Sequence, residues 1–232
     1  MKNIPSNYPH LLNRIPPTRN LTTGTLELYT VGASCGLGTV AKTMCQKVLQ
    51  EVKQQHKDGD KTLYKSIHTP GGRCDLFLKL EGHGYQLLQQ VLSFWKNARC
   101  PLYQPNAKLV EFACFISLPG SEGQMIHRDT QDIIQHKDAI SFGIPLQDIT
   151  PSMGPLVVRP TDGTRFWCLP AKQGQIYGWS QTVPHGGGAN VSSTERYVLY
   201  FTIVYPPVLD IDVGGYSLHP DYQPGLFLRQ VV

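Results

Sequence analysis

Two histidines and one carboxylate are the residues with the clearest capacity for chemistry. His127 and Asp129 form an H-x-D pair, and His185 follows much later, immediately before three glycines. Side chains alternate along an extended backbone, so His127 and Asp129 are expected to point to the same side. With a distant histidine they would occupy one face of an octahedral metal, as in the facial triad of non-haem Fe(II) oxygenases. The same donors also suit Zn(II) and Mn(II), so the residue types alone leave the metal open.

A second H-x-D match competes with the first. His136 and Asp138 lie among Gln, Lys and Asp residues, directly before an apolar stretch, which is typical of a solvated loop. The first pair is flanked by Gln, Met and Ile on one side and by Thr130 on the other. We therefore predict that His127 and Asp129 are the ligand pair.

Arg196 opens the apolar stretch RYVLYFTIVY, residues 196–205, a short distance after His185. An unpaired guanidinium is costly to bury in such a strand. A bound carboxylate would remove that cost through a bidentate contact, as the far carboxylate of a 2-oxo acid would. The alternative is a salt bridge to the adjacent Glu195.

A hydrolase is the competing enzyme class. Gly32-Ala33-Ser34-Cys35-Gly36 matches the G-x-S-x-G nucleophile motif, and His185 with its three glycines is similar to an oxyanion loop. Too few residues precede the motif to build a hydrolase sheet, and the glycine loop follows the nucleophile instead of preceding it. We interpret the glycines around Ser34 as residues at a helix entry.

The elements that must position these residues follow from periodicity. Residues 1–25 are expected to form an irregular arm, with a short strand at residues 26–31. Apolar spacing predicts amphipathic helices from Leu37 into KQQHKDGD and around residues 85–95, with an extended segment at 75–80 between them. From about residue 108 the pattern changes to short strands typical of a sandwich or jelly roll. The predicted strands cover residues 109–118, 139–146, 155–160, 165–169, 175–179 and 196–205.

Composition limits the class further. Hydrophobic residues make up 41% and charged residues 16% of the 232, which indicates a globular chain, and 22 Gly with 18 Pro favour many turns. The net charge of +4 is scattered, so we expect no nucleic acid partner. The six cysteines form no CxxC pair and are expected to be reduced thiols. Because no apolar run is long enough for a signal peptide or a membrane span, we expect a cytoplasmic protein without a membrane partner.

Three segments taken in order resemble the phytanoyl-CoA dioxygenase (PhyH-like) family of Fe(II)/2-oxoglutarate-dependent oxygenases. They are EFACFISLPGSEGQMIHRD (111–129), IPLQDITPSMGPLVVRP (144–160) and GQIYGWSQTVPHGGGANVSSTERYVLYFTIVY (174–205). GRCDLFLKL (72–80) is similar to a segment of some members. Two positions differ from the family pattern: a Pro-Gly-(Ser/Thr)-His turn is replaced by residues 160–165, and Gly187 replaces a hydroxyl residue.

The resemblance implies a mainly β (α+β) fold, a double-stranded β-helix (jelly roll, cupin-like) with two or more packing helices in the N-terminal half. It implies one domain over residues 1–232, with an arm and supporting helices in 1–107, the catalytic core in 108–205 and a tail in 206–232. It also implies Fe(II), with 2-oxoglutarate and O2 as cosubstrates, and hydroxylation of an aliphatic C–H of a small molecule with release of succinate and CO2. The implied site residues are the metal ligands His127, Asp129 and His185 and the 2-oxoglutarate anchor Arg196. Separately from the resemblance, the candidate pocket residues are Gln124, Arg128, Thr130 and Trp179, and for each of them a purely structural role is the alternative.

Asp129 occupies the position at which related halogenases carry a small residue, so no halogenation is expected. Two non-redox alternatives remain open at this point. One is a cupin-like protein that binds a metal and a small molecule without oxidising it, and the other is a catalytically silent jelly-roll module. The sequence specifies neither the substrate nor the oligomeric state.

Overall fold

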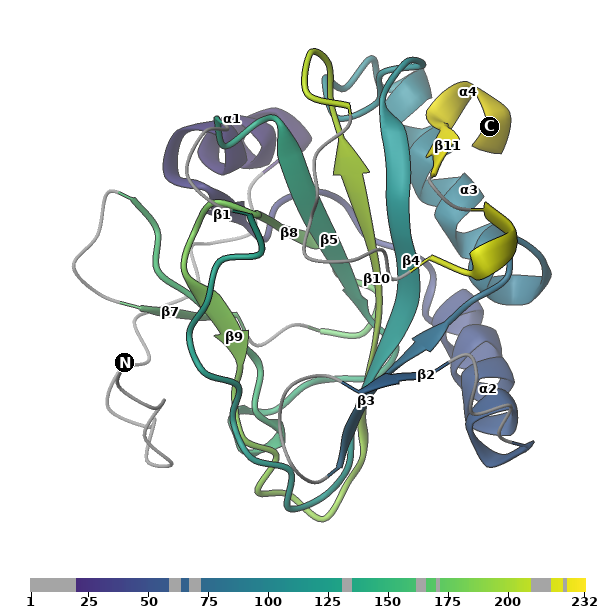
Figure 1. Ribbon diagram of the computed structural model, residues 1–232, viewed down its shortest axis with the longest axis vertical. Coiled ribbons are helices and arrows are strands. Elements are labelled where there is room, and N and C mark those ends of the chain that lie inside the picture. The colour runs from purple at the N-terminus through teal and green to yellow at the C-terminus, as the bar shows by residue number, and fades with distance from the viewer. Residues whose placement is uncertain are drawn as a thin grey trace.

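The computed structural model describes residues 20–58, 64–66, 72–130, 135–161, 166–169, 172–209, 218–222 and 225–232. Within them, antiparallel strands form a large sheet and a small one (Figure 1). The strands are β1 Ala33–Ser34, β2 Tyr64–Ser66, β3 Arg73–Phe77, β4 Lys108–Ser117, β5 Ala139–Pro145, β6 Leu156–Val158, β7 Trp167–Leu169, β8 Tyr177–Ser180, β9 His185–Gly187, β10 Arg196–Val204 and β11 Leu226–Phe227. The large sheet has the order β1-β8-β5-β10-β4-β3-β2, with β11 also paired to β4, and the small sheet has the order β7-β6-β9.

Strand β10 lies at the centre of the large sheet and is buried along its whole length. Its side chains alternate, as a period of two requires. Leu199 and Phe201 belong to the main hydrophobic core, whereas Val198 belongs to a second cluster that includes residues of the small sheet. Because both faces are covered, the strand is an almost continuous apolar run, and its first residue, Arg196, shares the inner face with Val198.

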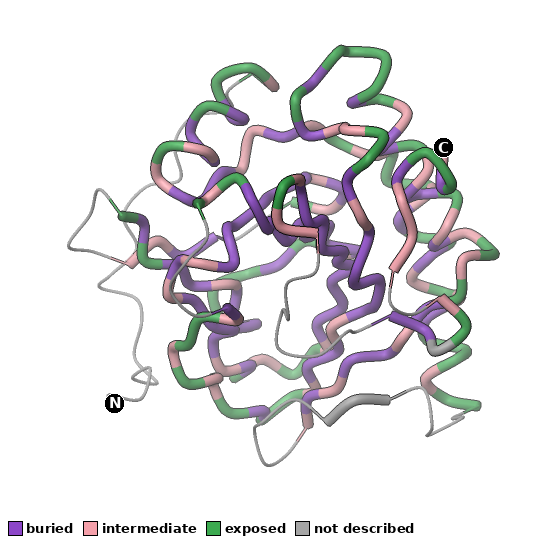
Figure 2. The backbone as a smooth tube through the Cα atoms, turned by 45° about the horizontal axis from the view of Figure 1, so that its top comes forward, coloured by how far each residue is buried: buried purple, intermediate pink, exposed green. Residues whose placement is uncertain are grey.

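Two helices cover the outer face of the large sheet (Figure 1). They are α2, Lys42–Asp58, and α3, Gly82–Asn97. Trp95 of α3 packs against two phenylalanines of the sheet, with its ring centroid 4.8 Å from that of Phe142 and 6.0 Å from that of Phe201. The expected pair of packing helices is therefore confirmed, because the main hydrophobic core contains residues of both helices and of the large sheet. Buried residues gather toward the middle of the molecule and exposed ones toward its outside (Figure 2).

The expectation for the segment before β1 was wrong. Residues 26–31 are not a strand, and residues 21–25 are not irregular, because Leu21–Val31 form helix α1. The Asn20 side chain accepts a hydrogen bond from Thr23 N, and Gly32 ends the helix in the left-handed conformation at φ 84°. Gly32 thus stands at a helix exit, and Ala33 and Ser34 enter a strand. The G-x-S-x-G match therefore lacks the strand-to-helix context of a nucleophile elbow.

Helix α2 begins at Lys42 and not at Leu37 as its apolar spacing suggested. Gly38 has φ 120°, outside the helical region, and Thr39 forms a β-bridge with Gln175. Leu37 and Val40 still pack on the core, although they precede the helix. The apolar period therefore identified the buried face correctly but not the start of the helix.

The six strands expected after residue 108 are all present, as β4, β5, β6, β7, β8 and β10. Residues 185–187, expected to be a turn and a loop, form the additional strand β9, which pairs with β6 and is buried. The two antiparallel sheets and the apolar cluster between them form a jelly roll whose sheets do not close, so the expected fold class is confirmed. No helix in the described part of the chain is both long and apolar enough to cross a lipid bilayer.

Candidate metal centre and anion pocket

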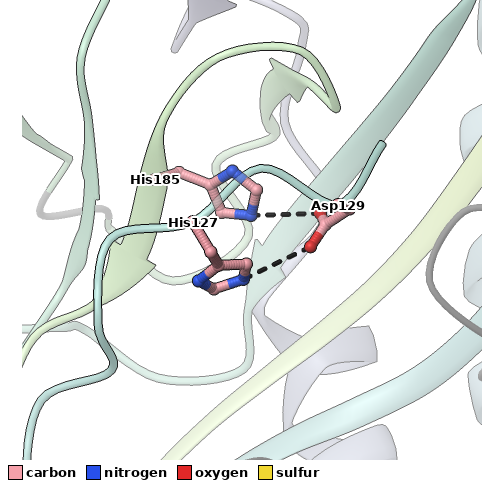
Figure 3. Close-up of side chains that lie close together, drawn as sticks. All are labelled: His127, Asp129 and His185. Atoms are coloured by element: carbon pink, nitrogen blue, oxygen red, sulfur yellow. Dashed lines mark ion pairs between the residues drawn. The ribbon is translucent and has the colours of Figure 1, made fainter. Parts of the chain in front are cut away.

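Two segments far apart in the sequence bring the two histidines together. His127 follows the loop after β4, and His185 is the first residue of β9. Their backbones form an antiparallel bridge, with His127 N donating to His185 O at 3.0 Å and His185 N donating to His127 O at 2.9 Å. Backbone pairing therefore holds the two ligand candidates side by side without any contribution from a metal (Figure 3).

Both imidazoles point at the same carboxylate (Figure 3). His127 Nε2 lies 3.3 Å from Asp129 Oδ1, and His185 Nε2 lies 3.1 Å from Asp129 Oδ2. The three candidate ligand atoms lie within 4.8 Å of one another. The sequence-predicted triad is thus assembled in space. Among the described residues it is the cluster of His, Cys, Asp and Glu side chains with the geometry to hold a metal ion.

The tautomer of each histidine is set by a local hydrogen bond. Nδ1 of His127 lies 2.8 Å from the carbonyl oxygen of Met125, and Nδ1 of His185 lies 2.9 Å from that of Val183. A carbonyl can only accept, so each Nδ1 carries the proton and donates it. The Nε2 atoms face Asp129 and contact its carboxylate in the metal-free protein, and a metal would take the place of these contacts. This arrangement commonly orients metal-binding histidines.

The charge distribution of the cluster favours a cation. Burial by itself would raise the pKa of Asp129. The charge of His185 and the hydrogen bonds from His185 and His127 outweigh it and hold this pKa well below its usual range. The hydrogen bond with Asp129 raises the pKa of His127. The side chains of His127, Asp129 and His185 are 41%, 24% and 6% exposed, so the cluster is open to solvent on the His127 side.

The second H-x-D pair has a different environment. His136 Nδ1 is 2.6 Å from the Thr182 hydroxyl, and burial together with the charge of Arg128 lowers the pKa of His136. Asp138 accepts a hydrogen bond from Gln135 N at 2.7 Å within its own turn. Neither residue belongs to the triad. Asp138 stabilises the turn before β5, and His136 contacts the loop after β8.

Arg196 is buried on the inner face without an acidic partner among the described residues. Its Nη2 donates to Ser117 Oγ at 2.8 Å and its Nη1 to Met153 O at 3.2 Å, while its Nε has no partner. The alternative ion pair with Glu195 is not formed, because Glu195 accepts a hydrogen bond from Tyr197 instead. Burial lowers the pKa of Arg196 to about 10, so it stays charged at neutral pH.

A second buried arginine lies beside it, and the sequence reasoning missed it. Arg73 of β3 pairs in register with Ser117, which in turn pairs with Arg196. Arg73 Nε donates to Glu122 O at 2.7 Å, and its Nη2 donates to Gly188 O. Burial and, to a smaller extent, the charge of Arg196 lower the pKa of Arg73 to about 9. The sequence did contain a signal for Arg73, because this arginine begins an apolar segment just as Arg196 does.

Gly187 lies where the two guanidinium groups converge. A Cβ at this position would lie 2.5 Å from Arg73 Nη1 and 3.2 Å from Arg196 Nη2. The family's hydroxyl residue therefore has no room here, and the Ser117 hydroxyl contacts Arg196 from the neighbouring strand instead. The other departure from the family pattern falls partly on residues 162–165, which lie outside the described residues.

The four expected pocket residues occupy different environments. Gln124 Oε1 accepts a hydrogen bond from Gly187 N at 2.8 Å, which places it at the arginine pair. Trp179 stacks at an angle on His185, with ring centroids 5.7 Å apart, and Thr130 is buried directly after Asp129. Arg128 is exposed.

Comparison with known proteins identifies the fold but no family. No protein-family model matches this chain, and no curated protein sequence matches it. Solved structures are similar over most of it. SnoN, a non-heme alpha ketoglutarate dependent epimerase from nogalamycin biosynthesis, has a TM-score of 0.65 at 13% identity and covers 85% of this chain and 94% of its own.

Two further structures show the same likeness. HygX from Streptomyces hygroscopicus, solved with nickel and 2-oxoglutarate bound, has a TM-score of 0.61 at 11% identity and covers 85% of this chain and 95% of its own. EvdMO1 has a TM-score of 0.63 at 16% identity over 81% of this chain, which spans 50% of the EvdMO1 chain. At these identities the likeness establishes that the chain has the jelly-roll fold of these proteins.

Proposed function

We propose that this protein is an Fe(II)- and 2-oxoglutarate-dependent dioxygenase that hydroxylates an aliphatic C–H of a small organic substrate. The observation that carries the proposal is the His127–Asp129–His185 cluster together with two buried arginines, neither of which has an acidic partner among the described residues. The sequence resemblance to the phytanoyl-CoA dioxygenase family points to the same chemistry. So does the fold shared with SnoN and with HygX, whose structure contains nickel and 2-oxoglutarate.

The donor set fits Fe(II). Two neutral imidazole nitrogens and one carboxylate are the ligands of the facial triad, which leaves the opposite face open for other ligands. The Nδ1 hydrogen bonds to Met125 and Val183 orient both rings so that their Nε2 atoms, the ligand atoms, face Asp129. The low pKa of Asp129 keeps its carboxylate charged. His127, Asp129 and His185 would therefore hold the metal without rearrangement of the backbone.

The arginine pair fits the far carboxylate of 2-oxoglutarate. Two like charges buried side by side repel each other, and an anion between them would remove that repulsion and pair the free Arg196 Nε. Gly187 is two residues along β9 from His185, so the anion pocket lies roughly 6–7 Å from the metal ligand. That separation matches a five-carbon diacid whose other end reaches the metal.

Bound Fe(II) and 2-oxoglutarate would supply the oxidising chemistry, consuming O2 and releasing succinate and CO2. The chain's own residues bind and orient. Arg196 and Arg73 hold the cosubstrate carboxylate, Ser117 positions Arg196, and Trp179 excludes water from the buried side of His185. SnoN is described as an epimerase, so the same site architecture serves more than one outcome. We propose hydroxylation here, and the retained Asp129 argues against halogenation.

Anaerobic titration of Fe(II) and 2-oxoglutarate into the metal-free protein tests the proposal, with a weak visible charge-transfer absorption as the readout. We expect the absorption in the wild type and in His136→Ala, and its loss in His127→Ala. Arg196→Ala should require a much higher 2-oxoglutarate concentration to produce it. Fe(II) binding without this absorption would favour the non-oxidative cupin-like alternative, and no Fe(II) binding would favour a silent jelly-roll module.

A further inference from the structure

A row of polar side chains crosses the inner face of the large sheet at the end opposite the arginines. Glu111 of β4, Thr202 of β10 and Ser141 of β5 are cross-strand neighbours, because Thr202 is paired in register with both of the others. Gln181 follows β8 and contacts Ser141. All four side chains are buried.

The hydrogen bonds in this row run in one direction. Thr202 donates its hydroxyl proton to Glu111 Oε2, so its oxygen must accept from Ser141, whose Oγ lies 2.6 Å away. Ser141 Oγ in turn accepts from the Gln181 amide nitrogen. Every donor points toward the Glu111 carboxylate. The side-chain oxygen Oε1 of Gln181 therefore stands at the head of the row as an acceptor.

Three buried polar atoms, on residues that belong to the row, contact His185 or follow Asp129, have no hydrogen-bond partner among the described residues. They are Gln181 Oε1, the Trp179 indole Nε1 and Thr130 Oγ1, and all three side chains are at least nine-tenths buried. Such groups are rare in folded proteins because an unpaired buried donor or acceptor is destabilising. Ser141, which Gln181 contacts, is paired in register with Trp179, so both residues lie beside Ser141. The Trp179 ring lies against His185. Thr130 follows the ligand candidate Asp129.

We propose that these atoms bind a hydroxyl group of the substrate beside the metal, so that the substrate is an alcohol, a polyol or a sugar-bearing molecule. A hydroxyl both accepts, from the Trp179 N–H, and donates, to Gln181 Oε1. A ketone would leave Gln181 Oε1 unpaired, and an ammonium would leave the Trp179 N–H unpaired. The assignment of this site to a substrate rests on the oxygenase function proposed above.

The position of the site agrees with this role. The arginine pair and Gly187 occupy one end of β9 and are assigned to the cosubstrate, whereas Trp179 contacts His185 at the other end. A hydroxyl held at Trp179 and Gln181 would place its neighbouring carbon atoms next to the metal cluster. Thr130 Oγ1, which can donate or accept, is available for a second polar group of the same ligand.

The test uses three probes of one shape that differ only in hydrogen bonding: cyclohexanol, cyclohexanone and cyclohexylammonium. Each is titrated up to its solubility limit into the ¹⁵N-labelled full chain, with and without Zn(II) and 2-oxoglutarate. Zn(II) replaces Fe(II) here because it is diamagnetic. The readout is the indole N–H resonance of Trp179, identified by its loss in Trp179→Phe. We expect cyclohexanol to shift this resonance saturably and to bind at least about fivefold more tightly than either other probe, because each mismatch leaves a buried group unpaired.

Gln181→Met removes the acceptor while keeping the length of the side chain, and it should abolish the preference for the alcohol. Gln50→Met, on the exposed surface of α2, is the matched control and should preserve it. Three outcomes would overturn the proposal: equal affinities for the three probes, no shift with any of them, or an unchanged preference in Gln181→Met. Each would mean that these atoms are hydrated or serve only the fold.

The indole readout requires neither iron nor turnover, so the two proposals fail separately. An alcohol preference without the visible Fe(II)–2-oxoglutarate absorption would retain the hydroxyl site and remove the oxygenase. The absorption without an alcohol preference would remove the hydroxyl site alone.

Discussion

Arg73 and Arg196 meet at a single glycine, although 122 residues lie between them. Their Nη1 and Nη2 atoms would lie 2.5 Å and 3.2 Å from a Cβ on Gly187. Ser117, which stands between them in the strand register, contacts Arg196. Among the described residues no acidic side chain forms an ion pair with either guanidinium, so the pair forms a buried concentration of positive charge close to the His127–Asp129–His185 cluster.

The first prediction concerns the space at Gly187. Gly187→Ala places a methyl group against Arg73 Nη1, so the guanidinium must move out of the pocket. We expect weaker 2-oxoglutarate binding, measured by anaerobic titration, with Fe(II) affinity close to that of the wild type. Gly123→Ala is the control, because its nearest neighbour to a new Cβ is at an ordinary 3.4 Å. Equal 2-oxoglutarate affinity in the two variants would contradict the assignment of the pocket.

The second prediction concerns Arg73 itself. Arg73→Met keeps most of the aliphatic length but removes the charge and the donors. A hydrogen bond to a charged group contributes about 1.5–3 kcal/mol, so the dissociation constant of 2-oxoglutarate should rise roughly 10- to 150-fold. Arg99→Met, at an exposed position at the end of α3, should leave the constant unchanged. If Arg73 only supports the fold, thermal stability will fall in Arg73→Met while 2-oxoglutarate affinity is retained in the fraction that is folded.

The third prediction concerns the polar row on the inner face. Thr202→Val is nearly isosteric but deprives the buried Glu111 carboxylate of the hydroxyl that donates to it, and it deprives Ser141 of an acceptor. We expect the free energy of unfolding to fall by about 1–3 kcal/mol. Urea denaturation measures this change, with Thr43→Val on the exposed side of α2 as the control. A loss no larger than that of the control would show that the row is not a stabilising network.

The fourth prediction concerns alkaline pH. Burial raises the pKa of Cys35 to about 12 and the pKa values of Cys45, Cys74 and Cys168 to about 11. In the unfolded chain these thiols titrate near about 8.5, so above that pH the unfolded state binds fewer protons than the folded state and stability declines. The stabilisation is complete below the unfolded pKa and is lost progressively toward the folded values.

Urea unfolding at neutral pH and at about pH 10 measures this decline. Cys35→Ala should reduce the difference between the two conditions, because one of the shifted groups is gone. A free energy of unfolding that is independent of pH over this range would contradict the prediction. The same high pKa values imply slow alkylation of these thiols in the native protein and rapid alkylation after unfolding.

The sequence by itself determined the features that depend on local spacing. The H-x-D period brings His127 and Asp129 to one side of an extended segment, and alternation along residues 196–205 places Arg196 on the same face as Val198. The six strands expected after residue 108 and the jelly-roll class followed from turn spacing and apolar runs. Helix α1 was missed, because its evidence was its caps, Asn20 and Gly32, and not a strong apolar period.

Tertiary structure alone decided which distant residues meet. The His127–His185 bridge depends on backbone pairing between a loop and β9, which leaves no periodic signal in either segment. The contribution of Arg73 and Ser117 depends on the register of β3, β4 and β10, and a shift of one residue would turn both side chains to the opposite face. The unpaired polar atoms of Trp179, Gln181 and Thr130 can be identified only in the folded structure. Whether a buried group has a hydrogen-bond partner depends on all the residues packed around it, most of which are distant in the sequence.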